Sequence, residues 1–261
     1  MIRVLVTGAA GRMGREVVRA VAAEPDMAVV AAVDPAAPGV AIDDGAGGAV
    51  TCSADLPAAL RETRPDVLVD FTRPDAAEAD VRTALAEGVD CVVGTTGLPE
   101  ETLRDLAEGV PEDTCLFVAP NFAIGAVLMM RFAAEAARFL PHAEVVELHH
   151  DRKLDAPSGT ALRTARLIAE ARGETPAAGG RETESVPGAR GAAVEGVAVH
   201  SVRLPGLVAH QEVLLGGQGQ TLTLRHDSID RTSFMPGVLL AVRKVGSLSG
   251  LVVGLEELMG E

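Results

Sequence analysis

The feature that most constrains the fold is an apolar strand, a glycine turn and a helix at the amino terminus. Residues 2–8 read I-R-V-L-V-T-G, a short apolar run typical of a buried strand. The turn G-A-A-G-R-M-G over residues 8–14 leads into a helix rich in alanine and valine, which we expect to end near Ala23. This order is typical of a dinucleotide-binding unit, although the spacing G-x-x-G-x-x-G differs from the commoner G-x-G-x-x-G.

Each glycine of the turn has an expected role. Gly8 permits the tight turn, Gly11 lets backbone N–H groups approach a pyrophosphate, and Gly14 allows close packing of the helix on the strand. Simple turns also use glycine, so the motif alone is weak. A second apolar strand strengthens it, because that strand ends in Asp34, twenty residues after Gly14. The Asp34 carboxylate is placed to bind the adenosine ribose hydroxyls.

The same carboxylate bears on the choice between NADH and NADPH. Asp34 would repel a 2′-phosphate, which favours NADH. Arg12, which lies in the turn, could offset that repulsion and leaves NADPH open.

Three further apolar runs, at residues 66–72, 89–94 and 114–119, are expected strands. Gly94–Gly97 and Pro120–Phe122 follow two of them. Open α/β sheets bind ligands at the carboxyl ends of their strands, so both segments are expected on the ligand side. The small residues of the first would let a nicotinamide ribose come close; a plain strand-to-helix turn is the alternative.

The character of the chain changes after a long apolar helix expected over residues 125–140. Alternating segments at residues 196–203 and 211–225, set between glycine and proline turns, indicate an antiparallel sheet. Residues 173–191 are rich in Gly, Pro, Glu and Arg and are expected to form an exposed, mobile loop. An apolar helix, residues 237–245, precedes a glycine-punctuated tail.

The most informative run for chemistry is E-L-H-H-D-R-K-L-D-A-P-S-G-T over residues 147–160. Its lysine, Lys153, is one of two lysines beside twenty-one arginines, so a cationic position taken at random would be Arg. A partly desolvated ammonium can release a proton and a guanidinium effectively cannot, which indicates a general acid. The run also opens a helix at Ser158-Gly159-Thr160, where N–H groups and the Thr160 hydroxyl favour an anion. A surface loop with an ordinary helix cap is the alternative.

Composition excludes several classes of function. The chain of 261 residues has a formal net charge of −14, which disfavours binding to nucleic acid or to an anionic membrane. Trp and Tyr are absent, so there is neither a broad stacking platform for bases nor a tyrosine general acid. No signal peptide or membrane span is recognisable, and we expect a cytoplasmic enzyme. Cys52, Cys91 and Cys115 lack metal-ligand or redox spacing, so we expect reduced thiols and no metal site.

Several motifs together resemble dihydrodipicolinate reductase of lysine and diaminopimelate biosynthesis. They are G-A-A-G-R-M-G, D-F-T, G-T-T-G, A-P-N-F, the H-H-x-x-K-x-D-x-P-S-G-T run and the closing R-T-S-F-M-P-G, and they span essentially the whole chain. The resemblance implies an α/β fold, with a Rossmann-type doubly wound parallel sheet in a dinucleotide-binding domain, residues 1–120, completed by 232–261. It implies a second α+β domain, residues 121–231, built on an open mixed or antiparallel sheet that binds substrate and forms a homotetramer.

The implied reaction is hydride transfer from NADH or NADPH to a cyclic imine dicarboxylate, giving tetrahydrodipicolinate with loss of water from the 4-hydroxy precursor. His149 resembles the family's proton donor and acceptor and Lys153 its general acid. The implied carboxylate ligands are His150, Gly159 and Thr160, to which the helix start adds Ser158. The implied cofactor ligands are Gly8, Ala9, Ala10, Gly11, Arg12, Met13, Asp34, Gly94, Thr95, Thr96, Ala119, Pro120, Asn121 and Phe122. Pro35 stands where relatives with strong NADPH use often have Arg, which again favours NADH.

The remaining polar residues have plainer expected roles. Asp151, Arg152 and Asp155 are assigned to a solvated loop or to support of the site. Three histidines of the expected sheet are expected to form hydrogen bonds to neighbouring residues and not to bind a ligand: His200, His210 and His226. Arg231 could reach a cleft between the domains, but helix capping explains it equally well.

Two rival functions remain at this point. A semialdehyde or homoserine dehydrogenase would share the first strand and the glycine turn, but the semialdehyde enzyme needs a nucleophilic cysteine in an electropositive setting. A non-catalytic nucleotide sensor would have no reason to keep two imidazoles and a rare lysine together.

Overall fold

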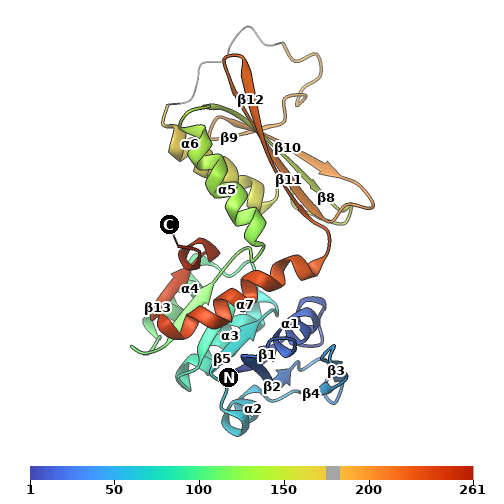
Figure 1. The fold of residues 1–261 in the computed structure, drawn as a ribbon, viewed down its shortest axis with the longest axis vertical. Coiled ribbons are helices and arrows are strands. Elements are labelled where there is room, and N and C mark those ends of the chain that lie inside the picture. Colours follow the sequence, from blue (N-terminus) through green and yellow to red (C-terminus); the bar gives the residue numbers. More distant parts are fainter. Residues whose placement is uncertain (175–182, 261) are drawn as a thin grey trace. The chain divides into compact units, whose positions relative to one another are not determined.

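The computed structural model describes residues 1–174 and 183–260, which form two compact units. Unit 1 comprises Met1–Ile124 and Arg231–Glu261, and unit 2 comprises Gly125–Asp230. The chain therefore leaves unit 1 once and returns to it near its carboxyl end, as Figure 1 shows by colour.

Within the described residues, unit 1 contains one eight-stranded sheet in which seven strands run parallel and β3 is antiparallel to its neighbour β4. The strands, in order across the sheet, are β13 (Gly250–Val253), β7 (Cys115–Val118), β6 (Asp90–Val93), β5 (Val67–Asp70), β1 (Ile2–Thr7), β2 (Met27–Val33), β4 (Ala49–Ser53) and β3 (Ala41–Asp43). The helices are α1 (Arg12–Ala22), α2 (Leu56–Thr63), α3 (Pro74–Ala86), α4 (Glu100–Glu108) and α7 (Met235–Lys244).

This strand order is the predicted doubly wound arrangement. The chain proceeds from β1 to β2 on one side and from β5 through β6 to β7 on the other. The near-continuous apolar character of the strands follows from burial on both faces, and all four residues of β5 and of β7 are buried. The strand order reverses beside β1, where sheets of this kind bind their ligands.

The glycine turn between β1 and α1 is fixed by close backbone contacts. Gly8 has φ +66, and a Cβ there would lie 2.5 Å from the carbonyl oxygen of Phe71. A Cβ on Gly14 would lie 2.1 Å from the carbonyl oxygen of Gly8 and 2.7 Å from Cα of Ala9. Gly14 is thus closely packed as predicted, although its contact is with the turn itself instead of the strand.

Unit 2 contains, within the described residues, a five-stranded sheet with two helices beside it. The strands, in order, are β12 (Gln220–Ser228), β11 (Ala209–Gly217), β8 (His142–His149), β10 (Val197–Arg203) and β9 (Ala192–Val194). The helices are α5 (Ile124–Ala137) and α6 (Gly159–Arg172). The sheet is mixed, because β8 pairs parallel with β10 and antiparallel with β11.

The mixed sheet agrees with the fold that the family resemblance implied, whereas the alternating segments alone indicated antiparallel pairing. β8 and β10 run parallel because the chain between them crosses over through α6. The alternating run 211–225 divides into β11 and β12, which are joined by a tight hairpin at Gln218-Gly219. Gly219 has φ +73, a conformation that glycine adopts without steric cost.

One face of the unit 2 sheet carries its apolar core. Val145 of β8, Val199 of β10 and Val213 of β11 pack with Ala165 and Ile168 of α6. Because successive residues of a strand alternate between faces, Glu147 and His149 lie on the same face as Val145. The sheet therefore directs a carboxylate and an imidazole toward its covered side.

Several elements were not predicted from the sequence. The short strands β3, β4 and β13 and the helices α2 and α4 belong to this group. β13 lies in the glycine-punctuated tail and extends the sheet beside β7; its four residues are too few to show a period. Of the expected loop at residues 173–191, residues 175–182 lie outside the described part of the chain.

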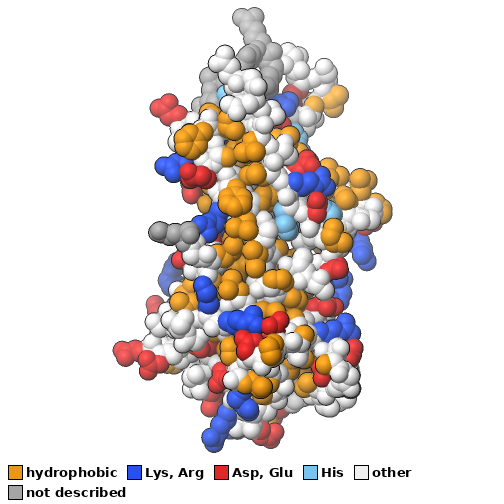
Figure 2. Space-filling model, in the orientation of Figure 1, with side chains coloured by type: hydrophobic (Ala, Val, Ile, Leu, Met, Phe, Trp, Pro, Cys, Tyr) orange, Lys and Arg blue, Asp and Glu red, His pale blue; other side chains and the backbone are white. Residues whose placement is uncertain are grey.

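The described surface is mixed in charge. Figure 2 shows acidic and basic side chains interspersed on the face it draws. Exposed apolar side chains include Phe132 of α5 and Phe139, which follows the end of that helix, at 55% and 76% exposure. Among the described residues, no helix is long and apolar enough to cross a membrane.

Candidate active site

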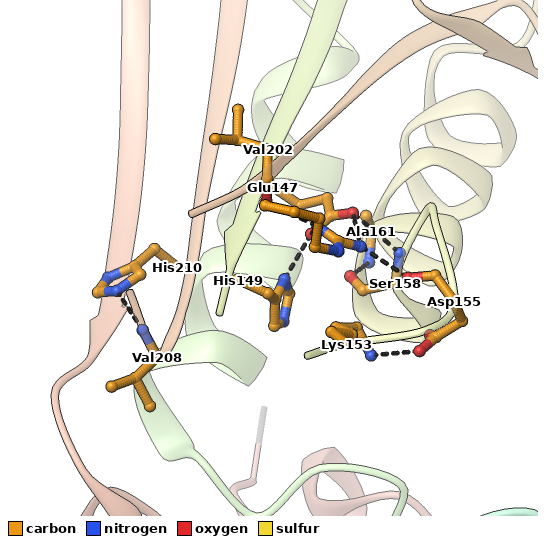
Figure 3. A network of polar contacts seen from close by, with 10 residues as sticks. Glu147, His149, Lys153, Asp155, Ser158, Ala161, Val202, Val208 and His210 are labelled. Atoms are coloured by element: carbon orange, nitrogen blue, oxygen red, sulfur yellow. Dashed lines mark hydrogen bonds and ion pairs between the residues drawn. The ribbon is translucent and has the colours of Figure 1, made fainter. Parts of the chain in front are cut away.

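The centre of the site is Glu147, a carboxylate at the end of β8 whose side chain is completely buried. Its Oε1 accepts hydrogen bonds from Nη2 of Arg203 at 2.8 Å and from the backbone N–H of Ser158 at 3.2 Å. Its Oε2 accepts from Nη1 of Arg203 at 2.9 Å and contacts Nδ1 of His149. Figure 3 shows Glu147 between the His149 ring and the start of α6 at Ser158.

These contacts decide the ionisation of Glu147. Burial by itself would raise its pKa, but the hydrogen bonds from His149 and Arg203 outweigh burial and hold the pKa at about 2. Glu147 is therefore an acceptor only, and the proton in its contact with His149 belongs to Nδ1 of the imidazole. Nε2 of His149 is then the ring nitrogen left for other chemistry.

Lys153 is tied to the same ion pair through the loop that follows β8. Arg203 donates from Nη2 to the backbone carbonyl of Asp155 at 2.7 Å, and the Asp155 carboxylate accepts from Nζ of Lys153 at 2.8 Å. The hydrogen bond from Lys153 lowers the pKa of Asp155. The Lys153 side chain keeps 22% of its surface exposed. Asp155, assigned from sequence to a supporting or solvated role, supports Lys153.

The start of α6 combines an ordinary helix cap with open space. The Ser158 hydroxyl accepts from the N–H of Ala161 at 3.2 Å, so this side chain caps the helix. A Cβ placed on Gly159 would meet nothing within 4 Å. Thr160 lies in the first turn beside it. Nδ1 of His150 is buried and has no hydrogen-bond partner among the described residues, the kind of group that a bound carboxylate could satisfy.

Two of the three sheet histidines predicted to be satisfied by neighbouring residues have such partners. Nε2 of His200 lies 2.8 Å from Glu144, and Nδ1 of His210 lies 2.6 Å from Asp227. His226 is partly buried, and burial lowers its pKa.

In unit 1 the predicted cofactor residues gather at the carboxyl edge of the sheet. Gly8 to Gly11 form the turn after β1, and Arg12 and Met13 open α1. Asp34 follows β2 and approaches the same turn, because its Oδ2 accepts from the N–H of Ala10 at 3.2 Å. Oδ1 of Asp34 accepts from the N–H of Ala36 at 3.0 Å.

A second buried carboxylate, Asp70, joins three strand ends at this edge. Its Oδ2 accepts from the Thr7 hydroxyl at 2.6 Å, its Oδ1 accepts from the Thr95 hydroxyl at 2.5 Å, and both oxygens accept from the Thr72 hydroxyl. The side chain of Thr95 therefore points inward to Asp70, whereas Thr96 is exposed. Sequence reasoning missed Asp70; an acid closing a fully apolar strand is the signal that could have found it.

Aromatic packing explains two other predicted residues. A Cβ on Gly94 would lie 2.2 Å from the ring of Phe71, so the absence of a side chain at Gly94 makes room for that ring. Phe122 is buried, with ring centroids 5.8 Å from Phe71 and 6.1 Å from Phe117. Ala119, Pro120 and Asn121 precede it, directly after β7.

Two family models together account for nearly all of the chain. The model for "Dihydrodipicolinate reductase, N-terminus" matches residues 2–122, and that for "Dihydrodipicolinate reductase, C-terminus" matches residues 125–259. The chain belongs to the dihydrodipicolinate reductase family.

Relatives within the family are similar over their full length. The 4-hydroxy-tetrahydrodipicolinate reductase of Moorella thermoacetica is 53% identical, covering 99% of this chain and 98% of the relative. The enzyme of the same name from Desulfitobacterium hafniense is 50% identical, with the same coverage.

Solved structures agree with this assignment. The dipicolinate-bound dihydrodipicolinate reductase from Paenisporosarcina sp. TG-14 has a TM-score of 0.85 and 43% identity, and the match covers 98% of this chain and 99% of that one. An amine dehydrogenase from Mycobacterium smegmatis has a TM-score of 0.62 but 14% identity, which shows a shared fold alone.

The cysteines of this dihydrodipicolinate reductase family member do not suit a rival that needs a thiolate nucleophile. All three are free and buried. Burial raises the pKa of Cys52 and of Cys91, and burial together with Asp90 raises that of Cys115 to about 11. None has the electropositive setting that activates a catalytic thiol.

The second lysine of the chain qualifies the argument from lysine rarity. Nζ of Lys244, in α7, donates to the carbonyl oxygen of Leu258 near the carboxyl end of the chain. This lysine has a structural role, so rarity alone does not mark a lysine as chemical. The assignment of Lys153 rests instead on its ion pair with Asp155, which Arg203 connects to Glu147 and His149.

Proposed function

We propose that this chain catalyses the NAD(P)H-dependent reduction of 4-hydroxy-tetrahydrodipicolinate, through dihydrodipicolinate, to tetrahydrodipicolinate in lysine and diaminopimelate biosynthesis. The observation that carries the proposal is the site on unit 2, in which one buried ion pair holds His149, Lys153 and the start of α6 together. Relatives that are 50% identical or more over their full length bear the name of this activity.

Different residues of unit 2 are assigned to substrate binding and to proton transfer. The substrate carries two carboxylates, for which the His150 ring and the helix start at Ser158, Gly159 and Thr160 supply hydrogen-bond donors and a favourable dipole. Ser158 contributes by capping the start of α6, next to the open space at Gly159. Reduction of a conjugated imine leaves an electron-rich enamine that must take up a proton, and His149 or Lys153 supplies it.

The residues of unit 1 fit a dinucleotide. A bound NADH or NADPH would supply the hydride. The turn at Gly8 to Met13 has no room for Cβ atoms at its glycines and presents its backbone to a pyrophosphate. Asp34, beside this turn, is assigned to the adenosine ribose. Gly94, Thr95 and Thr96, with Ala119 to Phe122, follow β6 and β7 and are assigned to the nicotinamide half.

A coupled assay tests the proposal directly. The product of dihydrodipicolinate synthase is supplied with NADH or NADPH, and the loss of nucleotide absorbance is followed. We expect turnover that depends on the synthase product. Nucleotide binding without turnover would favour a sensor, and turnover with a semialdehyde instead would favour the rival dehydrogenase.

The cofactor assignment predicts a switch at Asp34. NADH should bind at least as tightly as NADPH, and Asp34→Ala should weaken NADH while sparing or strengthening NADPH, because the change removes a ribose hydrogen bond and a repulsion of the 2′-phosphate. Fluorescence or calorimetric titration of both nucleotides against both proteins measures this. A wild type that prefers NADPH tenfold, about 1.4 kcal/mol, would contradict the assignment.

The substrate assignment predicts inhibition by dipicolinate, the ligand named for the Paenisporosarcina structure. This planar dicarboxylate should compete with substrate, and Thr160→Val should weaken it by about 1.5–3 kcal/mol, the contribution of one hydrogen bond to a charged group. Inhibition constants for both proteins decide the matter. An unchanged constant in the variant would remove Thr160 from the site.

The family resemblance further leads us to propose a cytoplasmic homotetramer, with unit 1 binding dinucleotide and unit 2 binding substrate and forming the subunit contacts. Light scattering of the purified protein tests the number of subunits. A monomer at enzymatic concentrations would contradict the tetramer.

A further inference from the structure

The stability of the fold does not explain why a charged residue, Glu147, is buried in unit 2. Glu147 is fully buried on the sheet face that also carries the core residue Val145, with polar Ser201 and Gln211 opposite it on the two neighbouring strands. Burying a charge opposes folding unless the charge is paired and hydrogen-bonded, and replacing such a pair with apolar residues often leaves stability unchanged or higher. Stability is therefore a weak reason for Glu147 and Arg203 to occupy this place.

The contacts of the pair suggest another reason. Glu147 reaches the ring of His149 on its own strand and the backbone N–H of Ser158 at the start of α6. Arg203 reaches the carbonyl of Asp155, whose carboxylate holds Lys153. His149, Ser158 and Lys153 are thus each within one or two contacts of this pair.

We propose that Glu147 is a positioning residue for the reduction, which fixes the His149 ring with its proton on Nδ1 and holds that ring in register with the carboxylate-binding start of α6. The proposal rests on the role given to His149 in the proposed function. It adds a residue that touches neither substrate nor cofactor and acts through His149 and Ser158.

The hydrogen-bonding groups around position 147 explain why only a carboxylate fits there. Arg203 and the Ser158 N–H can only donate, so both oxygens of Glu147 are needed as acceptors. His149 must then donate from Nδ1, and Nε2 is the nitrogen directed to the reaction. In Glu147→Gln one oxygen becomes an NH₂ group, which cannot accept. If that group faces His149, the ring must accept at Nδ1 and carry its proton on Nε2 instead.

Nitrogen NMR of the full-length protein with ¹⁵N-labelled histidine tests this. Resonances of His149 are assigned from their loss in His149→Ala, and the pH is raised until the ring is neutral. We expect the wild type to show a protonated Nδ1 and an unprotonated Nε2, and Glu147→Gln to show the reverse. We also expect kcat of Glu147→Gln to fall by about 10²-fold, within the range of general acid–base catalysis, with the Kd for NADH within twofold of wild type.

Arg203→Lys provides the matched control, because it disturbs the same buried pair but keeps the carboxylate. A bidentate guanidinium is not replaced well by an ammonium, so this variant should lose thermal stability. We expect it to keep the wild-type His149 tautomer and to lose less kcat than Glu147→Gln. Equal losses of kcat in both variants, with the tautomer unchanged in both, would show that Glu147 acts through stability and would overturn the proposal.

The wild-type spectrum is decisive even if Glu147→Gln fails to fold, since a neutral His149 without a proton on Nδ1 overturns the proposal by itself. The proposed function fails separately, if the wild type shows no turnover in the coupled assay. If His149→Ala turned over at the wild-type rate, the reductase activity would stand, but Glu147 could not act through His149 and the proposal would be overturned.

Discussion

Lys153→Arg is expected to bind substrate and cofactor nearly as the wild type does but to turn over about 10²–10⁴-fold more slowly, the usual contribution of general acid catalysis. The positive charge survives in this variant, and a guanidinium can still pair with Asp155, so affinity for an anionic substrate is kept. The variant cannot supply the proton for the reaction, because a guanidinium does not release one near neutral pH. Steady-state constants in the coupled assay, with dipicolinate binding as a separate measure of affinity, give the result.

Lys244→Arg is the control for this experiment. Lys244 donates to the carbonyl oxygen of Leu258, so the same substitution at this second lysine should leave turnover unchanged. If Lys153→Arg kept near-wild-type kcat and changed only the apparent affinity for substrate, Lys153 would be a carboxylate anchor, and His149 or water would remain as the proton source.

Gly14→Ala is expected to cause a large loss of stability in unit 1. The added Cβ would lie 2.1 Å from the carbonyl oxygen of Gly8 and 2.7 Å from Cα of Ala9. Both neighbours are backbone atoms, so the turn itself must move. We expect a loss of about 3 kcal/mol, at the upper end of overpacking effects, which lowers Tm by about 6–12 °C. Because the same turn is assigned to the pyrophosphate, NADH binding should fall with it.

Gly109→Ala is the matched control in the same unit. Gly109 caps α4 with φ −93, and its added Cβ would lie 3.5 Å from the carbonyl oxygen of Leu106, an ordinary contact. Its Tm and NADH affinity should remain close to those of the wild type. A Gly14→Ala protein that melted within 2 °C of the wild type, roughly 1 kcal/mol or less, would show that the turn tolerates a side chain.

The sequence by itself determined the kind of fold and the residues of the site that lie close together along the chain. Most of the parallel strands of unit 1 are largely apolar, so they could be recognised without tertiary information. His149, Lys153 and Ser158 were found together because they occupy one short run. The pattern is not legible for β3 or β13, since three or four residues show no period.

The tertiary structure alone decided how the site is held. Arg203 lies fifty-six residues from Glu147, and the two meet because β8 and β10 pair in parallel with Ser201 opposite Glu147 and Arg203 opposite His149. Asp70 likewise meets Thr7 across sixty-three residues and Thr95 across twenty-five. Strand register is set by the packing of whole sheets, and a shift of one residue would turn each of these side chains to the opposite face. Residue type can indicate that an acid or a cation is present, but only the register determines which groups it contacts.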